Sequence, residues 1–65
     1  MNEIFIAPTT WSSSEAIAAA IDNGCAAVLS GIPPVYQATA DEQGWTLPCI
    51  ITEGAGGAIT DWRPV

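Results

Sequence analysis

The sequence contains no lysine, no histidine and one arginine, against seven aspartate and glutamate residues, so its 65 residues carry a formal net charge of −6. So little positive charge leaves almost nothing to neutralise phosphates, which argues against direct binding to nucleic acid or to an anionic membrane. The electrostatic field of such a chain instead favours encounter with a basic partner. Solubility alone also accounts for an acidic balance, and the composition leaves both explanations open.

The lack of histidine removes the commonest general acid–base group and a frequent zinc ligand. No serine or cysteine is accompanied by a recognisable base. The neighbouring carboxylates Asp41 and Glu42 have neither the facing geometry of a glycosidase pair nor the alternating oxygen ligands of a calcium loop. We therefore predict that the chain is not an enzyme and holds no metal or cofactor.

Only two cysteines are present, Cys25 and Cys49, in no metal-binding spacing. We expect buried, reduced thiols rather than a disulfide. No apolar run reaches the roughly 18 residues of a membrane-spanning helix, and no basic region of a secretory signal opens the sequence. The expected compartment is the cytoplasm.

What the sequence does have is one complete helix signal. Ser12 and Glu15 have the spacing of a capping box, in which each side chain satisfies a backbone N–H of the first turn. Asn23 and Gly24 supply the left-handed residue that commonly ends a helix. The rest of the chain is expected to pack around this helix.

Two faces are expected on the helix. Glu15 and Asp22, roughly 10 Å apart along the axis at 1.5 Å per residue, share the face toward water. The opposite face is apolar and is expected to be buried, and its residues are Ala16, Ile17, Ala20 and Ile21.

Apolar runs bounded by glycine and proline predict the strands. The three consecutive large apolar residues of the first run indicate a strand that is covered on both faces or lies centrally in a sheet. A parallel pair with a right-handed crossover is allowed for the first two strands. The expected strands cover residues 3–6, 25–30, 35–39, 45–52 and 59–65.

The second half of the sequence predicts antiparallel pairing. Residues 40–44 end in glycine and are typical of a hairpin turn, and Pro48 assigns the strand over residues 45–52 to an edge or a bulge. The glycine cluster at residues 54–57 lacks a following helix and a lysine, so it is interpreted as a turn rather than a phosphate loop. The fold class is one α+β domain over residues 1–65, with one short helix on a mostly antiparallel sheet of four to five strands in the order β-α-β-β-β-β.

With catalysis set aside, the carboxylates are interpreted as a binding surface. We expect folding to gather them into one negative face that occupies a basic nucleic-acid-binding site on a partner. Scattering over a solvated surface is the alternative. The predicted partner-binding residues are Glu15, Asp22, Asp41, Glu42, Glu53 and Asp61.

The aromatic residues Trp45, Trp62 and Tyr36 are expected to fill the core, with an exposed one serving as an interface anchor. Trp11, just before the helix cap, is expected to pack against Ala16. Arg63 is expected to pair with Asp61 or with a terminal carboxylate.

In size, acidity and lack of catalytic residues, the whole chain resembles the small anti-CRISPR proteins of phages and mobile elements, although no motif carries the resemblance. It implies a stoichiometric inhibitor in a bacterial host cell, and several acidic members of this group mimic DNA and bind type I surveillance complexes. The alternative is a small phage structural or assembly protein that acts through an apolar homo-oligomeric contact. A toxin-neutralising partner would share the same acidic surface.

Overall fold

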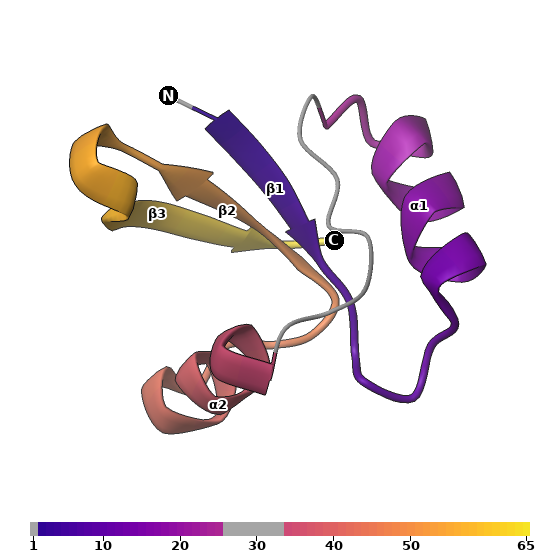
Figure 1. Cartoon of the computed structure of the whole chain (residues 1–65), viewed down its shortest axis with the longest axis horizontal. Helices are drawn as coiled ribbons and strands as arrows, with labels where there is room; N and C mark the ends of the chain where they lie inside the picture. Colours follow the sequence, from indigo (N-terminus) through magenta and orange to yellow (C-terminus); the bar gives the residue numbers. More distant parts are fainter. Residues whose placement is uncertain (1, 26–33) are drawn as a thin grey trace.

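The computed structural model describes residues 2–25 and 34–65 (Figure 1). The chain runs through β1 (Asn2–Ile6), α1 (Ser13–Asp22), α2 (Pro34–Gln43), β2 (Cys49–Glu53), the 3-10 turn η1 (Ala55–Gly57) and β3 (Ile59–Pro64). The strands form one antiparallel sheet in the order β1-β2-β3, so β2 is central.

The α+β class is confirmed, but the strand count is not. The described residues contain three strands and two helices, rather than four to five strands and one helix. The strand expected at residues 25–30 lies outside the described residues except for Cys25, which is not in a strand. The parallel pair expected there also depends on these residues, and every pairing in the described sheet is antiparallel.

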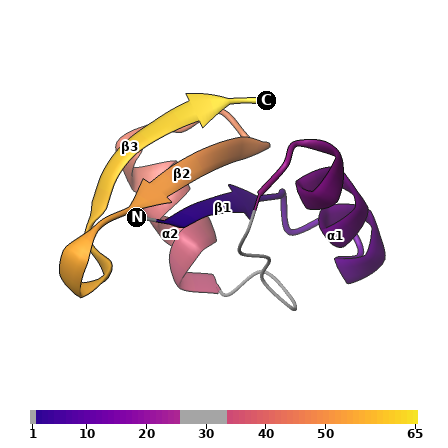
Figure 2. The ribbon, with the colours of Figure 1, turned by 90° about the horizontal axis from the view of Figure 1, so that it is seen from above.

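The sheet is covered on both faces, which is one of the two arrangements that the apolar run of the first strand predicts; the other, a central position, is wrong because β1 is an edge strand. Ile4 and Ile6 of β1 face a cluster that includes Ala40 of α2, whereas Phe5 faces a second cluster that includes Ala16 of α1. In Figure 1, α1 and α2 accordingly lie on opposite sides of the strands, and Figure 2 shows the same sheet from above. The protein therefore has two helical layers, each with its own outer surface.

Helix α1 begins and ends as its caps predict. The Ser12 hydroxyl accepts a bond from the backbone N–H of Glu15, and the Glu15 carboxylate accepts one from the N–H of Ser12, each at 3.2 Å. Gly24 has a φ of 71°, and the next residue, Cys25, donates its N–H to the carbonyl of Ala20 at 3.0 Å. This bond closes a Schellman motif and turns Cys25 into the core.

Helix α2 replaces the strand and hairpin turn predicted over residues 35–44, a prediction that is therefore wrong. Pro34 occupies the first helical position, where a residue without an N–H is favoured. Gln37 donates a side-chain bond to Asp41 one turn later at 3.2 Å. Gly44 has a φ of 73°, and the Trp45 N–H bonds to the Ala40 carbonyl at 2.9 Å, as at the end of α1. The glycine is thus a helix terminator and not the end of a hairpin.

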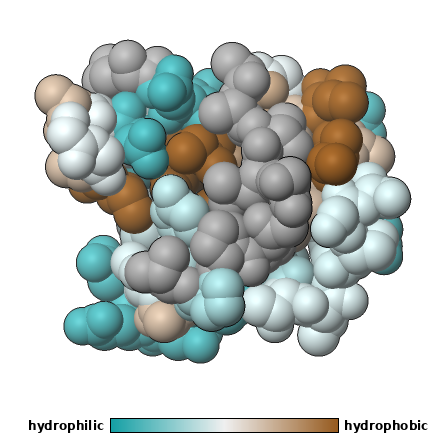
Figure 3. All heavy atoms as spheres, in the orientation of Figure 1, coloured by the Kyte–Doolittle hydropathy of each residue, from teal (hydrophilic) through white to brown (hydrophobic). Residues whose placement is uncertain are grey.

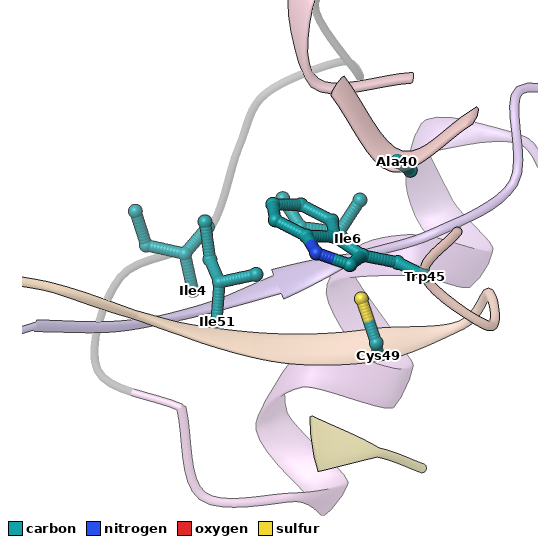
Figure 4. Close-up of a cluster of buried hydrophobic side chains, with 6 residues drawn as sticks. All are labelled: Ile4, Ile6, Ala40, Trp45, Cys49 and Ile51. Atoms are coloured by element: carbon teal, nitrogen blue, oxygen red, sulfur yellow. The ribbon is translucent and has the colours of Figure 1, made fainter. Parts of the chain in front are cut away.

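The helix end carries Trp45 into the cluster on the α2 side of the sheet, instead of opening a strand with it (Figure 4). Its ring stacks on that of Trp62 from β3, with centroids 6.3 Å apart. On the other side, Trp11 stacks on Phe5 with centroids 6.2 Å apart and packs against the cluster that contains Ala16. An aromatic pair thus reinforces each face.

The hairpin of this fold joins β2 to β3 through the glycine cluster, which confirms the interpretation of that cluster as a turn. Gly56 and Gly57 have φ values of 73° and 78°, which a side chain would disfavour. The edge position inferred from Pro48 is wrong, because Pro48 precedes β2 and β2 is the central strand. The Pro48 carbonyl accepts the N–H of Val65 at 3.1 Å, which fixes the end of the chain against it.

Candidate interaction surfaces

The six carboxylates predicted to bind a partner are accessible. Five are exposed, and Glu53 at the end of β2 is half-buried. The seventh, Glu3, forms an ion pair with Arg63, the one lysine or arginine side chain in the sequence. None of the six forms an ion pair within the described residues.

The expectation of one continuous negative face is wrong. Glu15 and Asp22 belong to α1, whereas Asp41 and Glu42 belong to α2, and these helices cover opposite faces of the sheet. Glu53 and Asp61 lie on β2 and β3. Folding therefore divides the carboxylates among the two helices and the sheet, because β1 buries apolar side chains on both of its faces and a helix covers each face.

Three of the carboxylates lie where helix electrostatics disfavours them. Asp22 ends α1, and Asp41 and Glu42 lie in the last turn of α2, and neither helix has a basic residue in its last turn. The C-terminal end of a helix carries partial negative charge, so each carboxylate there costs about 0.3–1 kcal/mol. Local stability would favour lysine or arginine at all three positions, and the sequence places acids there instead.

The outer surface of α1 also exposes apolar side chains. Ala16 and Ala20 are buried, as predicted, but Ile17 and Ile21 are 38% and 66% exposed, so the expected buried face is only half correct. Figure 3 shows hydrophobic atoms gathered over α1. The small alanines make the contact with the sheet, and each isoleucine follows an alanine by one position, which rotates it about 100° toward solvent. The row of alanines in the sequence could have indicated this exposure, since a helix that packs through alanine leaves the larger adjacent side chains in solvent.

Glu15 has a structural role in addition to its exposure. Its carboxylate accepts the Ser12 N–H and so helps to begin α1. Asp22 has no such role, because it lies at the opposite end of the helix. A test of charge on this helix must therefore keep the capping bond of Glu15.

Arg63 pairs with Glu3 and not with Asp61 or a terminal carboxylate, which corrects the sequence expectation. Glu3 is opposite Thr52 and Arg63 is opposite Ile50, so the ion pair reaches across β2 and joins the two edge strands. The hydrogen bond from Arg63 lowers the pKa of Glu3, and Glu3 raises the pKa of Arg63 in return. Asp61 contributes only a further electrostatic attraction to Arg63.

The two cysteines are free and buried, as predicted. Cys25 belongs to the cluster on the α1 side and Cys49 to that on the α2 side, so the sheet separates them. Burial raises the pKa of both thiols, which keeps them protonated at neutral pH. They act as small apolar residues of the core.

The part of the chain that the structure describes forms no pocket and no cluster of three side chains able to hold a metal ion. In residues 2–25 and 34–65, no helix is long and apolar enough to cross a membrane. Within the described residues, exposed side chains lie on both helices and on the edge strand β3.

Strand β3 forms one edge of the sheet, and sequence reasoning did not single it out. Five of its six residues are exposed. Trp62 stacks on Trp45 and is still 38% exposed, so it adds an aromatic surface to this edge. Its pattern of alternating side chains predicts a strand, but only the order of the strands shows that it lies at the edge.

Comparison with protein-family models, curated proteins and solved structures gave no match.

Proposed function

We propose that this protein is a stoichiometric binding module that uses exposed carboxylates to occupy a basic nucleic-acid-binding site on a partner protein. The observation that carries the proposal is the set of acids at the helix C-termini: Asp22, Asp41 and Glu42 oppose the helix dipoles and have no basic residue beside them. Natural proteins are rarely at their stability optimum, and one recurrent reason for a residue that lowers local stability is a function that it serves. A basic partner that contacts Asp22 would neutralise it in the complex, and all three acids add to the field that attracts such a partner.

The contact we propose is the outer surface of α1, consisting of Glu15, Ile17, Ile21 and Asp22. It combines two carboxylates with two exposed isoleucines on one capped helix. Apolar contact supplies affinity at the centre of an interface, and charge supplies steering and register. Asp41 and Glu42, on the other layer, then add to the long-range field without direct contact.

This contact is compact, and it differs from a continuous imitation of a DNA strand. The separation of the layers supports a module that blocks one part of a basic groove. The resemblance to anti-CRISPR proteins makes the DNA-binding channel of a type I surveillance complex the first partner to test. In that form of the proposal, the protein prevents DNA from binding without itself touching DNA.

The experiment uses the tagged chain to capture proteins from nuclease-treated bacterial lysate, with and without excess duplex DNA. The proposal requires a nucleic-acid-binding protein that is retained at low salt and released by high salt or by the DNA. A mobility-shift assay with a purified type I complex tests the finer proposal, which requires less DNA bound as the protein is added. Capture that is indifferent to both salt and DNA contradicts the proposal.

Matched variants then locate the contact. Glu15→Gln with Asp22→Asn removes two charges from α1 and keeps the capping bond, which glutamine can also make. Asp41→Asn with Glu42→Gln removes the same charge from α2. We expect the α1 variant to lose binding and the α2 variant to keep most of it, and equal losses would contradict the assignment to α1.

The same variants separate binding from folding. Removing Asp22 relieves an unfavourable interaction with the dipole of α1, so Asp22→Asn should raise the free energy of unfolding by about 0.3–1 kcal/mol while it weakens binding. Opposite changes in stability and affinity are a signature that a merely solvated carboxylate would not produce. A loss of both would indicate a structural role for Asp22.

A further inference from the structure

The outer edge of β3 offers hydrogen-bonding groups to another strand. The Val65 N–H donates to the Pro48 carbonyl, and β3 pairs with β2 in regular antiparallel register from Pro64 back to Asp61. Backbone groups of an antiparallel strand point alternately to its two sides. Those of Arg63 and Asp61 therefore point to β2, as those of Val65 do, and the N–H and C=O of Trp62 point away from the sheet.

Pro64 is consistent with this assignment. The backbone groups of residue 64 also point away from β2, so the missing N–H of proline costs no hydrogen bond to β2. The outward groups near the middle of β3 are thus the donor and acceptor of Trp62 and the acceptor of Pro64.

We propose that β3 pairs antiparallel with β3 of a second copy of this chain about a two-fold axis at Trp62, which joins the two sheets into one. In this register the two Trp62 residues exchange both of their backbone hydrogen bonds. Asp61 of each copy then lies opposite Arg63 of the other, in the closer, non-hydrogen-bonded type of pair. The inference depends on the geometry of β3 and not on the acidic-site proposal.

Charge complementarity selects this register over its neighbours. Asp61 and Arg63 stand one residue to either side of Trp62, on the same face of the sheet and with opposite signs. Moving the two-fold axis to Asp61 would bring the two aspartates together, and moving it to Arg63 would bring the two arginines together. Both alternatives oppose like charges.

Charged residues and proline on an edge strand also serve to prevent pairing. A charge prevents pairing when it would meet a like charge or be buried without a partner as two edges approach. Here the two charges attract in the register centred on Trp62, and the exposed ring of Trp62 lies at the axis. Arg63 keeps its bond to Glu3 in this arrangement, because a guanidinium has five N–H donors.

The test is sedimentation equilibrium of the full chain from micromolar to millimolar concentration. We expect a monomer–dimer equilibrium that Asp61→Arg or Arg63→Asp weakens about tenfold or more, because each single change opposes like charges at two symmetric positions. The double exchange, Asp61→Arg with Arg63→Asp, restores the complementarity and should restore the dimer. Glu53→Arg, with the same charge change outside β3, should leave association unchanged.

Two further measurements keep the test decisive. Glu3→Gln removes the internal partner of Arg63 and should leave the dimer in place, which separates the intermolecular pair from the intramolecular one. Amide exchange of the Trp62 N–H should slow as concentration rises. A wild-type chain that stays monomeric at millimolar concentration, or a folded double-exchange variant that does not regain the dimer, overturns the proposal.

Discussion

The burial of Ile51 gives the sharpest test of a fold in which a helix covers each face of the sheet. Ile51 lies on the central strand β2 and is 0% exposed, whereas Ile21 on α1 is 66% exposed. Replacing each by valine removes the same methylene group from two different environments. The pair of variants therefore compares burial while the chemical change is held constant.

Transfer of one methylene out of water is worth about 0.8 kcal/mol, and the residual cavity brings a buried isoleucine-to-valine change to about 0.5–1.5 kcal/mol. At 0.05–0.15 kcal/mol per residue, a chain of this length unfolds with about 3–10 kcal/mol, so the loss at Ile51 is measurable without unfolding the protein. A substitution at an exposed position such as Ile21 should stay within about 0.5 kcal/mol.

The assay is urea unfolding followed by tryptophan fluorescence. With a slope near about 1 kcal/mol per molar, Ile51→Val should lower the midpoint by about 1 M, and Ile21→Val should leave it nearly unchanged. Trp45 shares the cluster of Ile51 and stacks on Trp62, so two of the three tryptophans report on the affected face. Equal midpoint shifts for the two variants would refute the placement of α1 with its isoleucines outward.

Three further predictions follow from local geometry. Ser12→Ala removes the cap of α1 and should lower the free energy of unfolding by about 1 kcal/mol, as measured by thermal or urea unfolding; no loss would contradict the capping box. Gly24→Ala forces a side chain into a φ of 71° and should cost about 1–2 kcal/mol by the same measurement, whereas an unchanged midpoint would refute the left-handed cap. Because Arg63 lowers the pKa of Glu3 in the folded state, the ionised carboxylate stabilises the fold above the pKa of the unfolded chain, and this stabilisation is lost as the pH falls through the lower folded value. The advantage of the wild type over Glu3→Gln should thus be present at neutral pH and disappear in acid, and an advantage that is independent of pH would contradict the ion pair.

The first helix was predictable because its signals are local. A serine cap, a glutamate three residues later and an Asn-Gly end act within one or two turns, and the structure contains the bonds that they imply. The last strand was predictable for a related reason, since the glycine cluster before it and Pro64 at its end delimit it. The residues that begin and end each of these two elements lie within the element or next to it in the sequence.

The second helix was missed because its residues suit two structures. Val35, Tyr36 and Thr39 favour a strand by propensity, and Gly44 is a common end for both a hairpin turn and a helix. Pro34 at the first position and Gly44 just past the last were together a helix signal. Tertiary packing decides between the two structures: Ala40 and Trp45 close one face of the sheet, and the helix brings both there because the Trp45 N–H bonds back to the Ala40 carbonyl at its end.

The distribution of charge was not predictable from spacing along the chain. The order of the six carboxylates in the sequence does not show on which side of the sheet each one lies. For those on the helices, that side depends on which face of β1 each helix covers. The identity of β3 as an edge depended on strand order in the same way. Composition predicts the sign and size of the net charge, but the fold determines on which elements the carboxylates lie.

The two-layer arrangement also explains how one protein can present two unlike surfaces. Covering both faces of a three-stranded sheet uses both helices, so neither helix remains to cover the outer edge of β3. The one arginine lies on that strand, where it joins β3 to β1 through Glu3 and stands beside Asp61. Its placement leaves α1 and α2 without any positive charge, so the helices are uniformly acidic while the edge carries both signs. An acidic helix suits a basic partner, and an edge with both signs suits a second copy of itself.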